Sequence, residues 1–282
     1  YKDSGDTMAP WLQTQQMNIK KVVIAEGVTS IGDNAFYKCS NLDSVQFASS
    51  VVSIGKFAFA NAKLSEKLVV PGTVKTFGAS AFARCTALTD VTLESGEGIS
   101  YGNFLFDRCE TLKNVTLPST MTSVPGKMFS YCSAIEKLEI PNNVSSFGSV
   151  RFSPIEGMTS LKKITIPEGI KKTYARFFQS CSNLRTVDFQ GVTEIVANTF
   201  ASCTAVRELI LPSSLTTYVD TTQQMLPKLI YFKGTEEQWN TVIPEARRNA
   251  WAAAGTIVVC NYNATETGTP ATITAQPKSA KF

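Results

Sequence analysis

Residues 112–134, LKNVTLPSTMTSVPGKMFSYCSA, form one full unit of a pattern that recurs along most of this 282-residue chain. Aligning the chain on the phenylalanine of this unit gives eight units, whose phenylalanines lie 23, 23, 24, 23, 23, 26 and 22 residues apart. A ninth unit, VRELILPSSLTTYV, begins at Val206 and does not finish. Regular repeats of this length are typical of solenoid proteins. The aligned residues are Phe36, Phe59, Phe82, Phe106, Phe129, Phe152, Phe178 and Phe200.

Each unit combines an extended stretch with a short turn. The consensus L-x-x-V-x-I-P-x-x-V-x-x-I-G-x-x-A-F-x-x-C opens with apolar residues at the two-residue period of a β-strand. Proline follows the strand in five units, where its missing N–H ends the hydrogen-bonded ladder. The A-F-x-x-C segment places Phe and Cys three residues apart, which predicts a single helical turn.

A unit of this size cannot bury its apolar face alone, so neighbouring units must stack. The pattern therefore predicts an α/β solenoid, a right-handed β-α superhelix with a parallel sheet and a cap at each end. We expect an N-terminal cap over residues 1–21, about nine units over 22–232, a C-terminal cap over 233–262 and a tail or linker over 263–282.

Both caps are predicted from their sequences. Residues 9–20 suit an amphipathic helix that covers the first strand. Residues 235–254 predict helical segments interrupted by Pro244, and TIVVCNY after them predicts a final strand. The expected apolar anchors are Trp11, Leu12 and Met17 in the first cap and Trp239 and Trp251 in the second.

Composition excludes several classes of function. The chain has no histidine, which removes Ser-His-Asp and Cys-His catalysis and every histidine-containing zinc site. Its 27 Lys+Arg against 23 Asp+Glu leave a charge of +4, too close to balance to indicate a nucleic-acid partner. No apolar run approaches the ~18 residues that a membrane helix needs.

The repeat resembles the BspA-like leucine-rich repeat family, whose unit carries this strand, Pro, Ile-Gly and Ala-Phe-x-x-Cys pattern. The resemblance extends from residue 22 to about residue 232, and GTEEQW from Gly234 is similar to the family's terminal element. Ala62 and Met158 stand in Cys positions, and the sixth unit carries an insertion around residues 154–157. The resemblance implies a bacterial surface or secreted protein, and adhesion to host or neighbouring-cell proteins.

Six of the seven cysteines occupy the same position of the repeat, which predicts a ladder of buried free thiols. Disulfides between adjacent units are the alternative, since stacking could bring their Cα atoms within bridging distance. The sequence contains no C-x-x-C pair of the kind that binds zinc, so it indicates no metal site, and we expect no cofactor. The six are Cys39, Cys85, Cys109, Cys132, Cys181 and Cys203.

Binding is expected on the outward positions of the strands, which form the exposed face of the sheet. These positions carry mixed polar residues, without an aromatic row or a stripe of like charge, so a protein partner of unknown identity fits best and a merely solvated face is the alternative. The candidate patch comes from three consecutive strands, which lie ~4.8 Å apart. Its residues are Lys137, Glu139, Lys163, Thr165, Thr186 and Asp188.

These observations favour a non-enzymatic, monomeric protein that mediates protein binding or adhesion at a cell surface. The acidic residues are scattered one or two per unit, so no catalytic pair of carboxylates can be named. The alternative is a passive spacer that presents another domain.

Deletion of whole and partial units tests the repeat assignment. Removing residues 112–134 should leave a shorter folded solenoid, because each unit contacts only its neighbours. Removing 112–123 should abolish folding, because half a unit breaks the register. Circular dichroism and thermal melting of both variants provide the measurement, and equal tolerance of the two deletions would contradict a solenoid.

Overall fold

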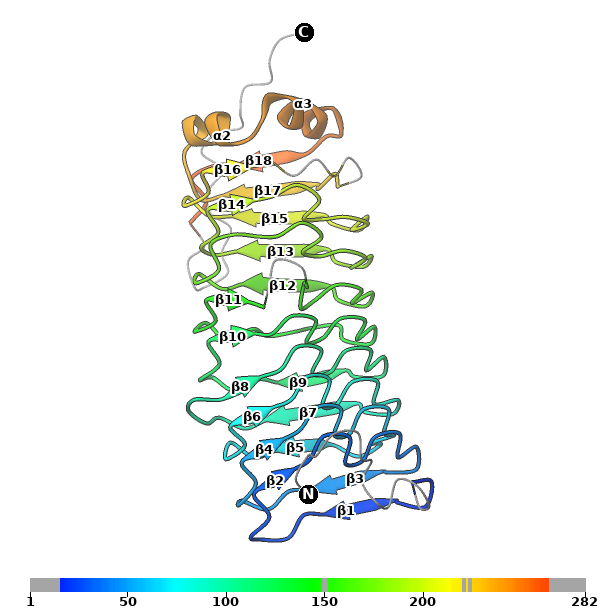
Figure 1. Cartoon of the computed structure of the whole chain (residues 1–282). Helices are drawn as coiled ribbons and strands as arrows, with labels where there is room; N and C mark the ends of the chain where they lie inside the picture. Colours follow the sequence, from blue (N-terminus) through cyan, green and yellow to red (C-terminus); the bar gives the residue numbers. More distant parts are fainter. Residues whose placement is uncertain (1–15, 149–151, 220–221, 223–224, 264–282) are drawn as a thin grey trace.

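The structure is a computed structural model that describes residues 16–148, 152–219, 222 and 225–263. The chain winds into an elongated stack of rungs, each with one strand on a front sheet and one short strand on a second sheet (Figure 1). All paired strands are parallel, and partners lie one unit apart in the sequence up to β17. The front strands are β1 (Lys21–Val23), β3 (Ser44–Gln46), β5 (Leu68–Val70), β7 (Asp90–Leu93), β9 (Asn114–Thr116), β12 (Lys163–Ile166), β13 (Thr186–Phe189), β15 (Glu208–Leu211), β17 (Leu229–Phe232) and β18 (Ile257–Val259).

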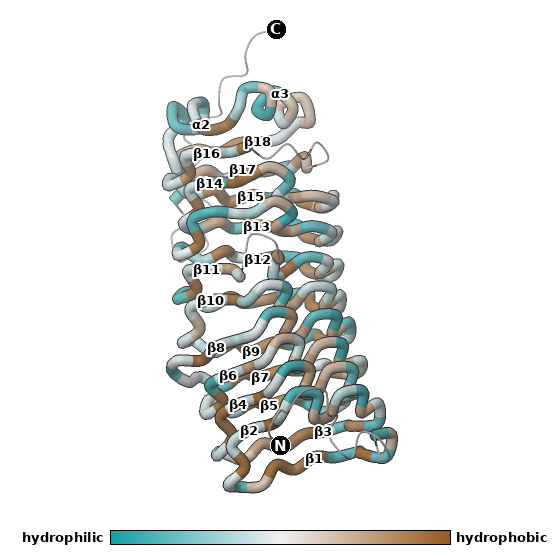
Figure 2. Tube along the Cα trace, viewed as in Figure 1, coloured by the Kyte–Doolittle hydropathy of each residue, from teal (hydrophilic) through white to brown (hydrophobic). Residues whose placement is uncertain are grey.

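The second sheet is formed by two-residue strands at the Ile-Gly part of each unit. It is divided into the groups β2-β4-β6-β8, β10-β11 and β14-β16. Hydrophobic residues concentrate along the strands and hydrophilic residues at the turns (Figure 2). These strands are β2 (Ser30–Ile31), β4 (Ser53–Ile54), β6 (Thr76–Phe77), β8 (Ser100–Tyr101), β10 (Ser123–Val124), β11 (Ser146–Phe147), β14 (Glu194–Ile195) and β16 (Thr217–Tyr218).

The predicted helical turn at A-F-x-x-C is wrong. The segment forms overlapping β-turns, because the residues two before and two after most repeat phenylalanines have left-handed φ values between 53° and 65°. Ser80 and Arg84, on either side of Phe82, are one such pair. In the described residues the repeats contain no helix, so the molecule is a β-solenoid of leucine-rich repeats and not a β-α superhelix.

The turns are stabilised by hydrogen bonds to the next rung. The N–H groups of Ser80, Phe82 and Arg84 donate to the carbonyls of Asn103, Leu105 and Asp107, at 2.9, 3.0 and 2.8 Å. The N–H of Ala83, between them, donates back to Ser80 at 3.1 Å. Left-handed backbone costs roughly 1 kcal/mol or more per non-glycine residue, and these bonds offset that cost.

Phenylalanine rings form the predicted core spine, except in the sixth unit. The rings of Phe59 and Phe82 are stacked with centroids 5.2 Å apart, and those of Phe106 and Phe129 with centroids 5.9 Å apart. All four rings are fully buried. Offset-stacked pairs of this kind add to the free energy of burial.

The assignment of Phe152 to this spine is wrong. In other rungs, the N–H of the spine residue donates to the carbonyl of the residue just before the next spine residue, and here Phe129 N–H donates to the Pro154 carbonyl. In other rungs, the repeat thiol donates to the carbonyl of the preceding spine residue, and here Cys181 Sγ donates to the Ile155 carbonyl. The fully buried Ile155 therefore fills the position, and Met158, three residues later, takes the Cys position. Phe152 is half-buried against the ring of Phe104, so the extra residues lie before Pro154 and not at 154–157.

The thiol ladder is confirmed, and all seven cysteines are free. Five of the six repeat thiols donate to the carbonyl of the spine residue one rung earlier, as Cys109 does to Phe82 at 3.2 Å. Burial raises the pKa of Cys39 to about 11 and that of Cys181 to about 12. These thiols are held protonated, and they serve packing.

The helices and final strand predicted for the C-terminal segment are present, whereas the segment predicted as the N-terminal cap lies mostly outside the described residues. Helices α2 (Glu236–Val242) and α3 (Glu245–Ala253) flank Pro244, and the two buried tryptophans stack with ring centroids 5.9 Å apart. β18 then pairs with β17. At the other end, residues 16–18 form a turn and Met17 is exposed. Trp11 and Leu12, like the tail from residue 264, lie outside the described residues.

A matched pair of substitutions tests the corrected spine. Phe129→Ala should lower the free energy of unfolding by roughly 3–5 kcal/mol, because a fully buried ring leaves a cavity in the stack. Phe152→Ala should cost less than about 2 kcal/mol, because the ring is only half-buried. Chemical denaturation measures both. Equal losses of unfolding free energy in the two variants would contradict the correction and assign Phe152 to the spine.

Candidate binding surface

The six candidate residues lie together on the front sheet. Lys163 pairs with Thr186, and Thr165 with Asp188, in the register of β12 and β13. Lys137 forms an isolated parallel bridge with Lys163, so its segment is the next rung of the same face. Three consecutive rungs therefore present all six side-chain positions side by side, and we call them the sheet patch.

Lys137 and Glu139 form an ion pair with each other. Lys137 Nζ lies 2.6 Å from Glu139 Oε1, and the two side chains are 75% and 76% exposed. The hydrogen bond from Lys137 holds the pKa of Glu139 below its ordinary value. An exposed pair of this kind contributes little to stability, so both charges remain accessible to a partner.

The front sheet is interrupted at the sheet patch. β9 and β12 belong to separate sheets, and in the described residues the front-face segment around Lys137 forms no strand and makes one bridge, from Lys137 to Lys163. Hollows of about 550 and 650 Å³ lie on either side of that segment. Lys137 and Glu139 line both hollows, and the larger one also contains Leu138, Ile140 and Ile164. The Lys137 segment is thus a polar ridge between two recesses, and the larger recess lies within the patch, between Lys137 and Lys163.

Asp188 differs from the exposed polar residue that the sequence suggested. It is half-buried, and its Oδ1 is buried without a hydrogen-bond partner. Burial raises the pKa of this carboxyl, an effect that Lys233, Gln190 and Lys163 oppose. A partner that donates a hydrogen bond to Oδ1 would recover part of this lost solvation.

The C-terminal end of the front sheet is apolar. The outward positions there include Ile210, Leu229, Tyr231 and the exposed Ile257. The ring of Tyr231 lies 4.2 Å from that of Tyr262, measured between centroids. The outward strand positions were predicted to lack an aromatic row, and that prediction left out the strand LIYF at residues 229–232. The alternation of side chains in LIYF predicts that Leu229 and Tyr231 point outward on the next strand of the same face.

A further hollow of about 410 Å³ separates β8 from β10 on the second sheet. In neighbouring rungs the glycine of Ile-Gly donates its N–H to the preceding rung, as Gly78 does to Ile54 at 2.7 Å and Gly102 to Phe77 at 2.9 Å. Pro125 occupies this position in the fifth unit and has no N–H to donate. The substitution accounts for the local separation of the rungs.

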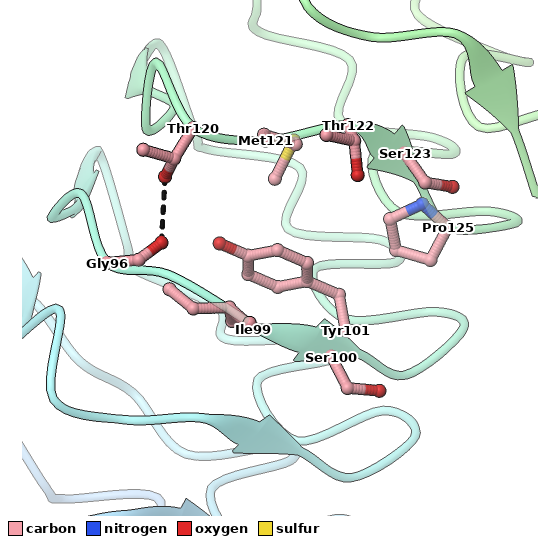
Figure 3. A pocket seen from close by; sticks show the side chains of 10 residues that line it. Gly96, Ile99, Ser100, Tyr101, Thr120, Met121, Thr122, Ser123 and Pro125 are labelled. Atoms are coloured by element: carbon pink, nitrogen blue, oxygen red, sulfur yellow. Dashed lines mark hydrogen bonds between the residues drawn. The ribbon is translucent and has the colours of Figure 1, made fainter.

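Uncharged groups line this hollow. Figure 3 shows the Tyr101 hydroxyl pointing into it, with Ser123 and Thr122 opposite. Burial raises the pKa of Tyr101 to about 12, so the hydroxyl is a neutral donor and acceptor. Thr120 Oγ1 donates to the Gly96 carbonyl at 2.8 Å and bridges the opening. The lining can exchange hydrogen bonds with an uncharged ligand and offers no charge to hold an ion.

The described residues give no other site of recognisable chemistry. Within residues 16–148, 152–219, 222 and 225–263, no three Cys, Asp or Glu side chains are grouped to hold a metal ion. The same residues contain no helix long and apolar enough to span a bilayer.

The repeats match the BspA type leucine rich repeat region in six copies, over residues 14–136 and 127–232. These matches extend over most of the chain, so the protein belongs to the BspA-type leucine-rich repeat family. Families with this fold are typically non-enzymatic scaffolds that bind proteins. No curated protein matches the chain.

Several solved structures are similar. A leucine rich cell surface protein from Faecalibacterium prausnitzii A2-165 is 23% identical over 80% of this chain, with a TM-score of 0.43. This chain spans 63% of that protein's length. A leucine-rich repeat protein from Bacteroides ovatus is 20% identical, covering 76% of this chain and 69% of its own, with a TM-score of 0.49. The pneumococcal vaccine antigen PcpA is 15% identical, covering 86% of this chain and 67% of its own, with a TM-score of 0.48.

Asp188→Asn tests the buried carboxyl. Its raised pKa means that the folded state binds more protons than the unfolded state between the ordinary pKa, 3.8, and the raised one. Stability is therefore lost as pH rises through this window. The variant should be more stable than the parent at about pH 7, and the difference should vanish in denaturation curves below about pH 3.

Asp43→Asn is the matched control. Hydrogen bonds from Lys63 and Ser65 lower the pKa of Asp43, so folding favours its charged form. That contribution is present above the ordinary pKa and is lost as pH falls through the lowered one. Asp43→Asn should therefore destabilise at neutral pH. Effects of the same sign in both variants would contradict the assignment of Asp188.

Proposed function

We propose that this protein is a non-enzymatic module, secreted or held at a cell surface, that attaches to host or neighbouring-cell proteins through the sheet patch. Membership of the BspA-type family supports protein binding. Cell-surface location and adhesion are the finer parts of the proposal, and they rest on the family resemblance. The solenoid presents the patch on a rigid frame, so little entropy is lost when a partner binds.

The observation that carries the proposal is the pair of hollows at the break in the front sheet beside Lys137. The strands of this face are joined in groups of two, three and five, with another break between β3 and β5, but the Lys137 segment has a hollow on each side. A partner side chain that enters the larger hollow can contact Leu138 or Ile164 while meeting charges of both signs at the rim. Buried apolar anchors with a polar rim are typical of protein interfaces.

Charge reversal tests the patch. A chain with Lys137→Glu and Lys163→Glu should capture less protein from solubilised extracellular matrix and from bacterial surface extracts than the parent does. The loss should be largest at low salt, because charge complementarity steers association. Affinity capture followed by quantification of bound protein is the measurement. Both side chains are exposed, so stability should change by no more than about 0.5 kcal/mol.

Lys21→Glu and Lys67→Glu form the matched control. Both residues are exposed lysines near the start of front-sheet strands, far along the solenoid from the patch. They make the same change in net charge and should leave capture unaltered. Equal capture by all three chains would refute the patch, and would favour the alternative of a passive spacer.

A further inference from the structure

Four basic residues occupy one register position in four consecutive rungs. Each immediately precedes a front strand, namely β12, β13, β15 and β17. Their backbones are joined in sequence: Arg185 N–H donates to the Lys162 carbonyl at 2.8 Å, Arg207 to Arg185 at 2.8 Å and Lys228 to Arg207 at 2.7 Å. We call this set the basic column, and its members are Lys162, Arg185, Arg207 and Lys228.

The column is exposed and mostly without acidic partners. All four residues are exposed, at the right-hand starts of the strands in Figure 1. Lys162 alone makes an ion pair, its Nζ lying 2.5 Å from Glu136 Oε2. Across the described residues Arg185, Arg207 and Lys228 form no ion pair, and Glu208 accepts a hydrogen bond from Thr186. Three adjacent cations therefore face solvent.

Such an arrangement lowers stability. Like charges on directly neighbouring strands repel. At the N-terminal end this position carries Lys20, Asp43, Glu66 and Thr89 in successive rungs. The one pair of like-charged neighbours among these four is Asp43 with Glu66, and there Asp43 is neutralised by an ion pair with Lys63. Packing does not require the run of cations, since their side chains lie outside the core.

The spacing favours one kind of polyanion. Rungs are ~4.8 Å apart, so the column presents four cations over about 14 Å in a straight line along the solenoid axis. An extended peptide repeats its same-face side chains every ~6.8 Å, which does not match. Duplex DNA places phosphates every 3.4 Å along each strand, which is shorter than the spacing between rungs. Single strands are usually bound with aromatic stacking, and the adjoining Lys163, Thr186 and Glu208 provide no aromatic ring. The length of one sugar unit with its linkage is of the same order as the spacing between neighbouring rungs.

We propose that the basic column binds a linear acidic polysaccharide, with sulfate or carboxylate groups on successive sugars, lying across the strand starts. Arg and Lys supply charge-assisted hydrogen bonds to such groups. This site adjoins the sheet patch, since Lys162 lines the larger hollow beside Lys163, and it adds a carbohydrate ligand to the proposed protein partner.

The test uses heparin as the sulfated probe, hyaluronan as the carboxylated probe and dextran as the neutral one. Surface plasmon resonance at several salt concentrations should give binding of at least one acidic polysaccharide and none of dextran. The variant Arg185→Gln, Arg207→Gln, Lys228→Gln should lose at least roughly tenfold in affinity, and the salt slope of log Kd should fall by about three, one for each cation removed.

Two control variants separate charge, position and folding. Lys20→Gln, Lys21→Gln, Lys56→Gln removes the same charge from exposed N-terminal sites and should leave binding unchanged. Arg185→Lys, Arg207→Lys should retain most of the affinity, because it keeps the charges. Melting curves should show that every variant folds.

Three outcomes would overturn the proposal. These are unchanged binding in the triple glutamine variant, equal loss in the N-terminal control, and binding of a DNA oligonucleotide or polyglutamate at the column as strongly as the polysaccharides. The last result would reassign the column to another polyanion. Lys137→Gln with Glu139→Gln removes one ion pair of the sheet patch without changing the net charge and should leave polysaccharide binding intact, so failure of the column and failure of the sheet patch are distinguishable.

Discussion

Hydrogen bonds that run along the solenoid axis are the constraint on which the structure depends. Both sheets and the turns between them direct N–H groups to carbonyls one rung away. Left-handed residues at the turns turn successive N–H groups alternately toward the next rung and back into the same one. Side chains then stack in columns with nearly constant identity, because identical rungs give identical environments. The phenylalanine spine and the thiol ladder both follow from this stacking.

Departures from the repeat generate the features that distinguish this molecule. Pro125 removes one axial donor and opens a hollow of about 410 Å³ between β8 and β10. The extra residues before Ile155 displace Phe152 from the spine. In the same unit, the front sheet separates around Lys137. Interruption of a stiff ladder produces recesses because close-packed neighbours cannot stretch to fill the space.

The surface is organised by the same register. Column neighbours on adjacent rungs are close in space although about one unit apart in sequence, so charges accumulate or cancel along columns. Lys137 with Glu139 cancels within a rung, whereas Arg185 and Arg207 add between rungs. A solenoid can therefore carry two surfaces of different chemistry side by side, a mixed polar ridge and a cationic line, on one rigid frame.

The sequence by itself determined the period, the strands, the buried thiols and the C-terminal cap, because each of these depends on local patterning that repeats. It also placed Lys163, Thr165, Thr186 and Asp188 on adjacent rungs, as the register of β12 and β13 shows, and the bridge from Lys137 to Lys163 adds the next rung. Only the tertiary structure decided the conformation of the turns, since the helical spacing of Phe and Cys is equally met by β-turns whose left-handed residues depend on bonds to the next rung. It likewise decided Ile155 over Phe152, the burial of Asp188 and the alignment of the basic column, because these are set by contacts between rungs and not by the order of residues within one.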